Sequence, residues 1–137
     1  RRILGDGKTI RGFVGGVTAG ILIGAVQMYA EISGLVPWFP PHTLTAVILL
    51  AIGSLLGDMV KSFFKRRQGI DRGGEWFLVD QLDFVVGALL LTLLFDPIWM
   101  LNTMTIPLLI VILVLTPLLH RTVNIIGYKL GLKKVPW

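Results

Sequence analysis

Two carboxylates at the start of the third long apolar stretch of the chain could bind a cation. Asp80 and Asp83 are three residues apart, so on a helix they lie on one face, one turn from each other. Apolar sequence follows at once from Phe84, which places both acids at or just inside a membrane boundary. Carboxylates there are costly unless a cation neutralises them, and Mg²⁺ favours one or two carboxylates together with waters and phosphate oxygens. The alternative is that both acids only complement the positive end of the helix dipole.

A third acid, Asp58, lies inside the preceding apolar stretch, about two turns before a basic cluster. An ionisable residue within a membrane span is a functional candidate. Asp58, Lys61 or Ser62, and Lys65 recur at three- and four-residue steps, which places them in one polar stripe along a helix. The alternative is an internal pair of Asp58 with Lys61 or Ser62 that only holds the helices together.

The segment 65–75 is basic and contains glycines. It begins with Lys65, Arg66 and Arg67 and continues with Asp71, Arg72 and two glycines. Arginine grips phosphate oxygens bidentately, and glycine lets the backbone approach a ligand closely. Consecutive bases are also typical of a cytoplasmic loop and of contact with anionic lipid headgroups. By itself this segment indicates only that an anion lies nearby.

Near the N-terminus, Lys8, Thr9 and Arg11 follow a Gly-Asp-Gly segment. The segment is not a P-loop, because the first glycine of that motif would stand where the chain has Arg2. We expect these three side chains to contact phosphate from a loop.

The last apolar stretch carries a polar stripe. Thr116, His120, Asn124 and Tyr128 are each four residues apart and share one helical face. Pro117 weakens the helical hydrogen-bond ladder just before His120. We expect His120 and Asn124 to make hydrogen bonds between helices, and contact with a substrate is the alternative.

Membrane helices must position these residues, because the composition excludes a water-soluble globular fold. Of the 137 residues, 54% are hydrophobic and only 15% are charged, against about 45–50% and 25% in soluble domains. The absence of cysteine excludes disulfides and thiol catalysis. Four apolar stretches reach the roughly 20 residues that a transmembrane helix needs: about 13–36, 43–64, 76–101 and 106–128. The sequence predicts one all-α polytopic membrane domain over 1–137, a helical bundle with four transmembrane helices.

The basic residues predict the orientation of this bundle. All thirteen lysines and arginines lie before the first stretch, at or beyond the end of the second, or at the end of the fourth. The other two connections contain none. Because positively charged short loops stay in the cytoplasm, we expect both ends and the loop 65–75 to face it. This topology explains the net charge of +5, so we expect no nucleic-acid partner.

Glycines recur every four residues in the first two stretches. Small residues at this spacing let helix backbones pack closely in lipid. The packing could lie within one bundle or join two copies in a homodimer. The glycines are Gly12, Gly16, Gly20, Gly24, Gly53 and Gly57.

The central motif resembles the signature of the phosphatidate cytidylyltransferases (CDP-diglyceride synthetases). From Gly57 to Gly73 the chain reads GDxxxSxxKRRxxxDRG, and residues 80–83 read DQLD. The family closes with DRxD, so Gln81 departs from it, and the family's His-Gly-Gly element is absent. These departures and the short chain resemble the archaeal branch, the CDP-archaeol synthases. The segment GDGKTxxG from Gly5, the pair His120 and Asn124, and the closing KKVPW are similar to that branch as well.

The resemblance implies Mg²⁺-dependent transfer of a cytidylyl group from CTP to 2,3-di-O-geranylgeranylglycerol 1-phosphate, an isoprenoid glycerol phosphate lipid. The products would be the CDP-activated lipid and pyrophosphate, made in the cell membrane on its cytoplasmic face. It implies a further N-terminal helix and thus a fifth span. It implies Mg²⁺ at Asp80 and Asp83 with Asp58, and a catalytic set that adds Lys65, Arg66 and Arg67. The implied substrate-binding residues are Lys8, Thr9, Arg11, Ser62, Asp71, Arg72, His120 and Asn124.

Two other functions fit part of the pattern. A small cation or proton transporter could use the three aspartates as an ion path, but it does not account for the bases on the same face. An anionic-lipid-binding subunit would account for the bases without any chemistry.

Overall fold

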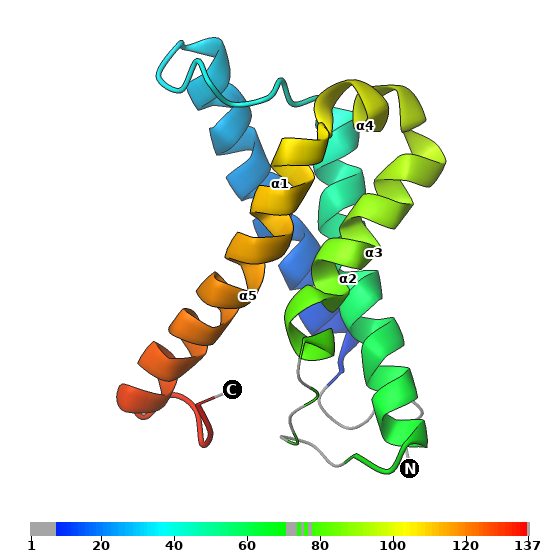
Figure 1. Ribbon diagram of the computed structural model, residues 1–137, viewed down its shortest axis with the longest axis vertical. Coiled ribbons are helices and arrows are strands. Elements are labelled where there is room, and N and C mark those ends of the chain that lie inside the picture. The colour runs from blue at the N-terminus through cyan, green and yellow to red at the C-terminus, as the bar shows by residue number, and fades with distance from the viewer. Residues whose placement is uncertain (1–7, 71–73, 75, 77, 137) are drawn as a thin grey trace.

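The chain folds into a bundle of helices (Figure 1). The computed structural model describes residues 8–70, 74, 76 and 78–136, and within them it contains five helices and no strand. The prediction of an all-α fold is confirmed. The helices are α1 (Ile10–Ile32), α2 (Leu44–Arg67), α3 (Val79–Phe95), α4 (Pro97–Thr103) and α5 (Ile106–Lys129).

Three of the helices begin at a threonine cap. In each, the threonine hydroxyl oxygen accepts a hydrogen bond from the backbone N–H three residues later, which satisfies one of the unpaired donors of the first turn. The caps are Thr9, Thr43 and Thr105, with distances of 3.0, 3.1 and 3.4 Å. The sequence thus marks the starts of α1, α2 and α5 locally, before any packing.

The stretch expected as one span over about 76–101 is divided into two helices. Helix α3 begins at Val79 and ends at Phe95, and Asp96 is both its C-cap and the N-cap of α4. Pro97 has no N–H to continue the ladder of α3, and the Asp96 carboxylate accepts a hydrogen bond from the N–H of Trp99 at 3.2 Å. The apolar pattern runs through this break, so hydropathy alone conceals it.

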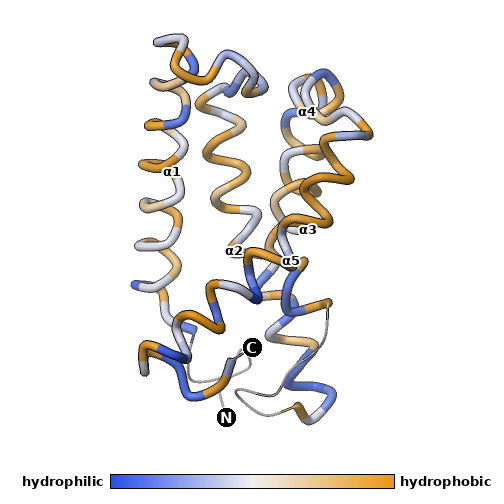
Figure 2. The backbone as a smooth tube through the Cα atoms, turned by 60° about the vertical axis from the view of Figure 1, so that its left-hand side comes forward, coloured by the Kyte–Doolittle hydropathy of each residue, from blue (hydrophilic) through white to orange (hydrophobic). Residues whose placement is uncertain are grey.

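Three helices are long and apolar enough to cross a membrane, judged by length and composition alone. Among the described residues these are α1, α2 and α5, of 23, 24 and 24 residues. Helix α3 has 17 residues. The tube in Figure 2 is mainly apolar along the middle of the helices and more hydrophilic at both ends of the bundle. The count of four spans and the additional N-terminal helix stay predictions.

Helices α2 and α3 pack side by side on a glycine seam, formed by Gly53, Gly57 and Gly87. A Cβ atom at Gly53 would lie 2.6 Å from the carbonyl oxygen of Gly87, and one at Gly57 would overlap the carbonyl oxygen of Asp83. The two backbones therefore approach each other more closely than any side chain at these positions would allow. This contact brings the polar stripe of α2 against the first turn of α3.

Helix α1 packs on α2 through the other glycines. A Cβ atom at Gly16 would lie 2.8 Å from Leu55, and one at Gly20 would lie 3.0 Å from Ala51. Gly24 meets Val47 in the same way. The glycine faces are thus occupied by the chain's own helices. The homodimer that the sequence suggested through these faces is therefore not supported.

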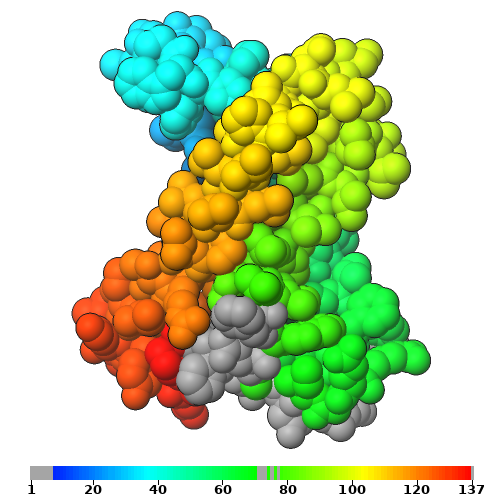
Figure 3. Space-filling model, in the orientation of Figure 1, coloured from blue at the N-terminus to red at the C-terminus, as the bar shows by residue number. Residues whose placement is uncertain are grey.

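Helix α5 crosses the face of the molecule seen in Figure 3 and is exposed along most of its length. Only Asn124 is buried among its residues. The starts of α1 and α3 and the ends of α2 and α5 lie at one end of the bundle (Figure 1). The bases of the described chain gather at this end, which we call the basic end.

Candidate functional site

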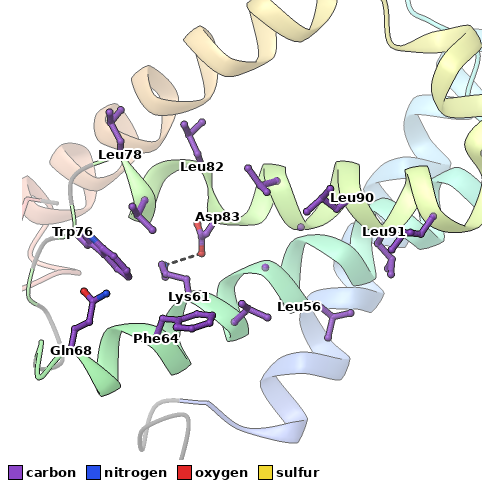
Figure 4. A pocket seen from close by; sticks show the side chains of 16 residues that line it. Leu56, Lys61, Phe64, Gln68, Trp76, Leu78, Leu82, Asp83, Leu90 and Leu91 are labelled. Atoms are coloured by element: carbon purple, nitrogen blue, oxygen red, sulfur yellow. Dashed lines mark ion pairs between the residues drawn. The ribbon is translucent and has the colours of Figure 1, made fainter.

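Three carboxylates from α2 and α3 meet around one ammonium group at the basic end. Lys61 Nζ lies 3.2 Å from Asp58 Oδ1, 3.3 Å from Asp80 Oδ1 and 2.9 Å from Asp83 Oδ2. Figure 4 shows Lys61 pointing from α2 toward Asp83 on α3. The predicted grouping of the three aspartates is thus present, with a lysine at its centre.

Two further lysines hold the outer carboxylates. Lys65 Nζ donates to both carboxylate oxygens of Asp80, at 2.9 and 2.7 Å, and the N–H of Trp76 donates to the same carboxylate at 2.7 Å. Lys8, in the segment before α1, pairs with Asp58. We call these six charged residues the lysine–carboxylate cluster: Lys8, Asp58, Lys61, Lys65, Asp80 and Asp83. Its three negative and three positive charges balance.

The cluster is most buried at the α2–α3 contact. The Asp83 side chain is only 5% exposed, whereas that of Asp58 is 33% exposed. Asp83 Oδ2 is buried and accepts no directed hydrogen bond from the described residues, although the Lys61 ammonium lies 2.9 Å away. Because a buried carboxylate is stable only when it is neutralised, Asp83 depends on Lys61 in this arrangement.

The donor chemistry of the cluster fits Mg²⁺, which prefers carboxylate oxygens and waters. Asp83 in particular presents a buried oxygen that lacks a directed hydrogen bond. As the side chains stand, however, no three His, Asp or Glu of the described residues are grouped closely enough to hold a metal ion. The Lys61 ammonium occupies the position between the carboxylates.

Lys61 is the site residue that the sequence analysis left out of the predicted set. Its signal was present, because it lies one turn from Asp58 in the polar stripe. The internal Asp58–Lys61 pair weighed as an alternative is found, at 3.2 Å. The pair does not end there, since Lys61 also reaches both acids of α3.

A long cavity of about 630 Å³ runs between α2 and α3. Lys61 and Asp83 line it in the half nearer the basic end, and its remaining walls are mainly apolar (Figure 4). Many of these apolar side chains are exposed, so the cavity is an open groove on the side of the bundle. They include Leu56, Val60, Phe64, Val86, Leu90 and Leu94. We call it the α2–α3 groove.

A second cavity of about 210 Å³ lies between the start of α1 and α2. Lys8, Thr9 and Asp58 line it. Asp58 thus faces the small cavity, Asp83 faces the α2–α3 groove, and Lys61 contacts both carboxylates.

The two arginines at the end of α2 lie outside the cluster. Arg66 Nη1 donates to the carbonyl oxygen of Ile70 at 2.6 Å, which closes the turn after the helix. The Arg67 guanidinium lies 4.8 Å from the centroid of the Phe63 ring. Neither arginine pairs with an acid of the described chain, so their predicted contact with phosphate stays a prediction.

The structure separates the other predicted substrate-binding residues. Thr9 caps α1, Arg11 is exposed on its first turn, and Ser62 is buried on α2 next to Lys61. Asp71 and Arg72 lie outside the described residues.

His120 and Asn124 contact each other within α5 and not across helices as expected. His120 Nδ1 and Asn124 Nδ2 are 3.2 Å apart, and Lys133 Nζ donates to Asn124 Oδ1 at 2.7 Å. The His120 ring lies 6.3 Å from that of Phe84, the residue after Asp83. Both side chains therefore belong to a second polar group, and His120 brings this group next to the second turn of α3.

Three membrane-length helices with a cluster of lysines and carboxylates at one end define a helical membrane protein with a charged site. Comparison with known proteins makes this specific. The family model described as CarS-like, CDP-archaeol synthase, matches residues 1–137. The chain belongs to this family. It is therefore an enzyme, a CTP-dependent cytidylyltransferase that acts on a lipid phosphate, and the transporter and lipid-binding alternatives are set aside.

Individual relatives agree with the family model. The CDP-archaeol synthase of Methanoculleus marisnigri is 56% identical over 137 residues, covering all of this chain and 82% of the relative. That of Methanoregula boonei is 56% identical over 138 residues with the same coverage. That of Methanosarcina mazei is 49% identical over 146 residues, covering all of this chain and 83% of the relative. No solved structure matches.

Proposed function

We propose that this enzyme transfers the cytidylyl group of CTP to 2,3-di-O-geranylgeranylglycerol 1-phosphate in a Mg²⁺-dependent reaction at the cytoplasmic face of the membrane. One observation carries the proposal. The lysine–carboxylate cluster lies between the mainly apolar α2–α3 groove and the small cavity, whose lining includes Lys8, Thr9 and Asp58. Lys61 contacts Asp83, which faces the groove, and Asp58, which faces the small cavity.

The α2–α3 groove suits the isoprenoid chains of the lipid. Its exposed leucines, valines and phenylalanine would otherwise face the bilayer, so apolar chains can lie along it without loss of hydrophobic burial. A lipid seated there brings its phosphate to Lys61 and Asp83, the charged residues of the groove.

The small cavity suits part of the nucleotide. Lys8 and Thr9 offer an ammonium group and a hydroxyl at its wall, and Arg11 is exposed on the first turn of α1. The triphosphate would extend from here toward Lys65 and the bases that follow it, Arg66, Arg67 and Arg72. Asp71, Ser62, His120 and Asn124 complete the proposed substrate contacts.

The reaction brings together two anions, the lipid phosphate and the triphosphate of CTP, so their charges must be neutralised. It needs no general base, because the attacking phosphate oxygen is already anionic. An oxygen of the lipid phosphate attacks the α-phosphorus of CTP, a new P–O bond forms, the bond from that phosphorus to the bridging α–β oxygen breaks, and pyrophosphate leaves. Asp80, Asp83 and Asp58 would hold Mg²⁺, which would supply charge stabilisation of the transferring group and of the leaving group. The lysines and arginines hold the phosphates in line, because phosphoryl transfer depends mostly on positioning and electrostatics.

The orientation follows from the bases. The basic end of the bundle carries the cluster, and positively charged short loops stay in the cytoplasm, where CTP is available.

A labelling experiment tests the proposed function. Purified protein with Mg²⁺ and the isoprenoid glycerol phosphate is expected to move label from α-³²P-CTP into the organic phase. Label from γ-³²P-CTP should stay in the aqueous phase, because it leaves with pyrophosphate. A diacylglycerol phosphate tests the choice of lipid. Retention of the α-label in water with every lipid and divalent metal would refute the proposal.

A further inference from the structure

Lys61 holds a position that no other base of the described cluster shares. Its ammonium lies within 3.3 Å of an oxygen of each of the three carboxylates. Among the described residues, Lys8 and Lys65 each pair with one carboxylate, Asp58 and Asp80 respectively. Lys61 therefore lies between the three acids, which would have to move closer together to share a divalent cation.

The charges of the cluster disfavour a metal ion that arrives alone. Three carboxylates are already balanced by three ammonium groups, so a free divalent cation would leave two uncompensated positive charges in a partly buried site. A metal ion that arrives with a nucleotide triphosphate brings its own negative charge. The same ammonium group that repels the bare ion then has a phosphate to bind.

We propose that Lys61 is a built-in counter-ion that makes metal binding at the cluster conditional on the phosphates of the nucleotide. This inference rests on the proposed function and adds a coupling to it. In the absence of nucleotide, Lys61 keeps Asp83 neutralised and the metal position filled. When the metal–nucleotide complex enters, the ammonium moves from the carboxylates to a phosphate, and the carboxylates take the metal ion.

The position of Lys61 supports this exchange. Its side chain is 14% exposed, and its ammonium lies 3.2 Å from Asp58, which lines the small cavity proposed for the nucleotide. A nucleotide phosphate can therefore reach Lys61 without separating α2 from α3. The four-carbon stem of lysine is flexible, and its ammonium acts as a point charge with no fixed fork to realign.

Metal binding without nucleotide tests the inference directly. Binding of Mn²⁺ to detergent-purified protein is followed by the loss of the free-ion signal in electron paramagnetic resonance, with no CTP present. Wild-type protein is expected to bind weakly. Lys61→Met removes one positive charge a few ångströms from the carboxylates and should tighten binding at least ~tenfold. Lys129→Met, which removes an equal charge from the exposed last turn of α5, should bind like the wild type.

Melting temperature gives a second readout that is independent of turnover. For the wild type we expect a rise with Mg²⁺ and CTP together, and none with Mg²⁺ alone, because a ligand stabilises only what it binds. Lys61→Met should show a rise with Mg²⁺ alone. If this variant does not fold, Lys61→Gln carries the same expectation, and the wild-type comparison stands without either variant.

The outcomes separate the two proposals. A wild type that transfers label and binds Mn²⁺ as tightly as Lys61→Met overturns the role of Lys61 and leaves cytidylyl transfer intact. A wild type that melts equally with Mg²⁺ alone and with Mg²⁺ and CTP overturns it as well. Absence of label transfer together with absence of any CTP-dependent change in melting refutes the proposed function itself.

Discussion

The two ends of the bundle both carry polar groups, but they use them differently. At the end opposite the basic end, which we call the far end, Glu31 accepts a hydrogen bond from the backbone N–H of His42 at 3.0 Å and lies 3.3 Å from its ring. The Trp99 indole N–H donates to the carbonyl oxygen of Pro41 at 2.7 Å, and Asp96 caps α4. Each of these contacts has a directed backbone partner.

At the basic end, the acids are held mainly by charge. Three carboxylates share Lys61, and Asp83 Oδ2 has a close ammonium group but no directed hydrogen bond among the described residues. These bonds at the far end, which we call the clamp, join α1 and α4 to the segment just before α2, and each polar group in them has its hydrogen-bond partner. We propose that the charges at the basic end exchange partners when the nucleotide binds. A binding site therefore differs from a structural contact in whether its polar groups can change partners. The number of polar groups does not separate the two.

The largest expected effect separates the two ends by activity. Asp83→Asn should lower kcat/KM at least about a hundredfold, because it weakens the metal site that stabilises the transferring group. Glu31→Gln, the matched change at the far end, should leave kcat/KM close to that of the wild type. Label transfer into lipid measures both, and elution as a single detergent-solubilised species checks that each variant folds. Near-normal turnover by Asp83→Asn would return that acid to a helix-dipole role.

The next effect concerns the contact that positions the cluster. Gly57→Ala should destabilise the protein by about 1–3 kcal/mol, since the added methyl overlaps the carbonyl oxygen of Asp83 and forces α2 from α3. Gly15→Ala is the control, because nothing lies within 4 Å of its added Cβ atom and alanine favours a helix over glycine by roughly 0.5–1 kcal/mol. Thermal unfolding in detergent measures both. Equal melting temperatures for the two variants would contradict the close backbone contact of α2 and α3 at Gly57.

A smaller effect probes the clamp at the far end. Trp99→Phe keeps the ring but removes the hydrogen bond to Pro41, so stability should fall by about 1 kcal/mol. The value of kcat/KM should not change, because the bond lies at the opposite end from the cluster. A large loss of activity with unchanged melting would show that the two ends are coupled.

The smallest effect concerns the arginines beside the cluster. Arg67→Lys and Arg66→Lys keep the charge and lose the planar fork, so we expect kcat/KM to fall severalfold for one or both. Arg121→Lys on the exposed face of α5 is the control. Accessibility labelling should show an unchanged orientation. Wild-type kinetics in both test variants would leave Arg66 and Arg67 as topology signals.

Local spacing predicted much of this site, and packing between helices decided the rest. The three-residue step from Asp80 to Asp83 is enough to place both acids on one face, and the structure brings Asp58 to them. No local pattern states which helix faces which, so the central place of Lys61 could not be read before α2 and α3 were seen together.

The break in the third apolar stretch shows a different limit. Asp96 and Pro97 end α3 and begin α4 within one apolar run. A proline in such a run can either kink a continuing helix or stand at the first position of a new one. Hydropathy measures only the preference for lipid. The sequence does mark the break, because Asp96 followed by Pro97 is typical of a helix start. The prediction of one span rested on the number of apolar residues and did not use this local pattern.

The glycine seam also limits how this protein can change over generations. Gly53, Gly57 and Gly87 already carry the smallest side chain, so neither helix has volume to give up when the other gains a methyl group. In a core, a larger side chain at one position is often compensated by a smaller one at a neighbouring position. No such compensation is available here, because the facing residues are already glycines. The close approach of the two backbones therefore sets the distance between the acids of α2 and α3. We expect substitutions at these three glycines to be selected against.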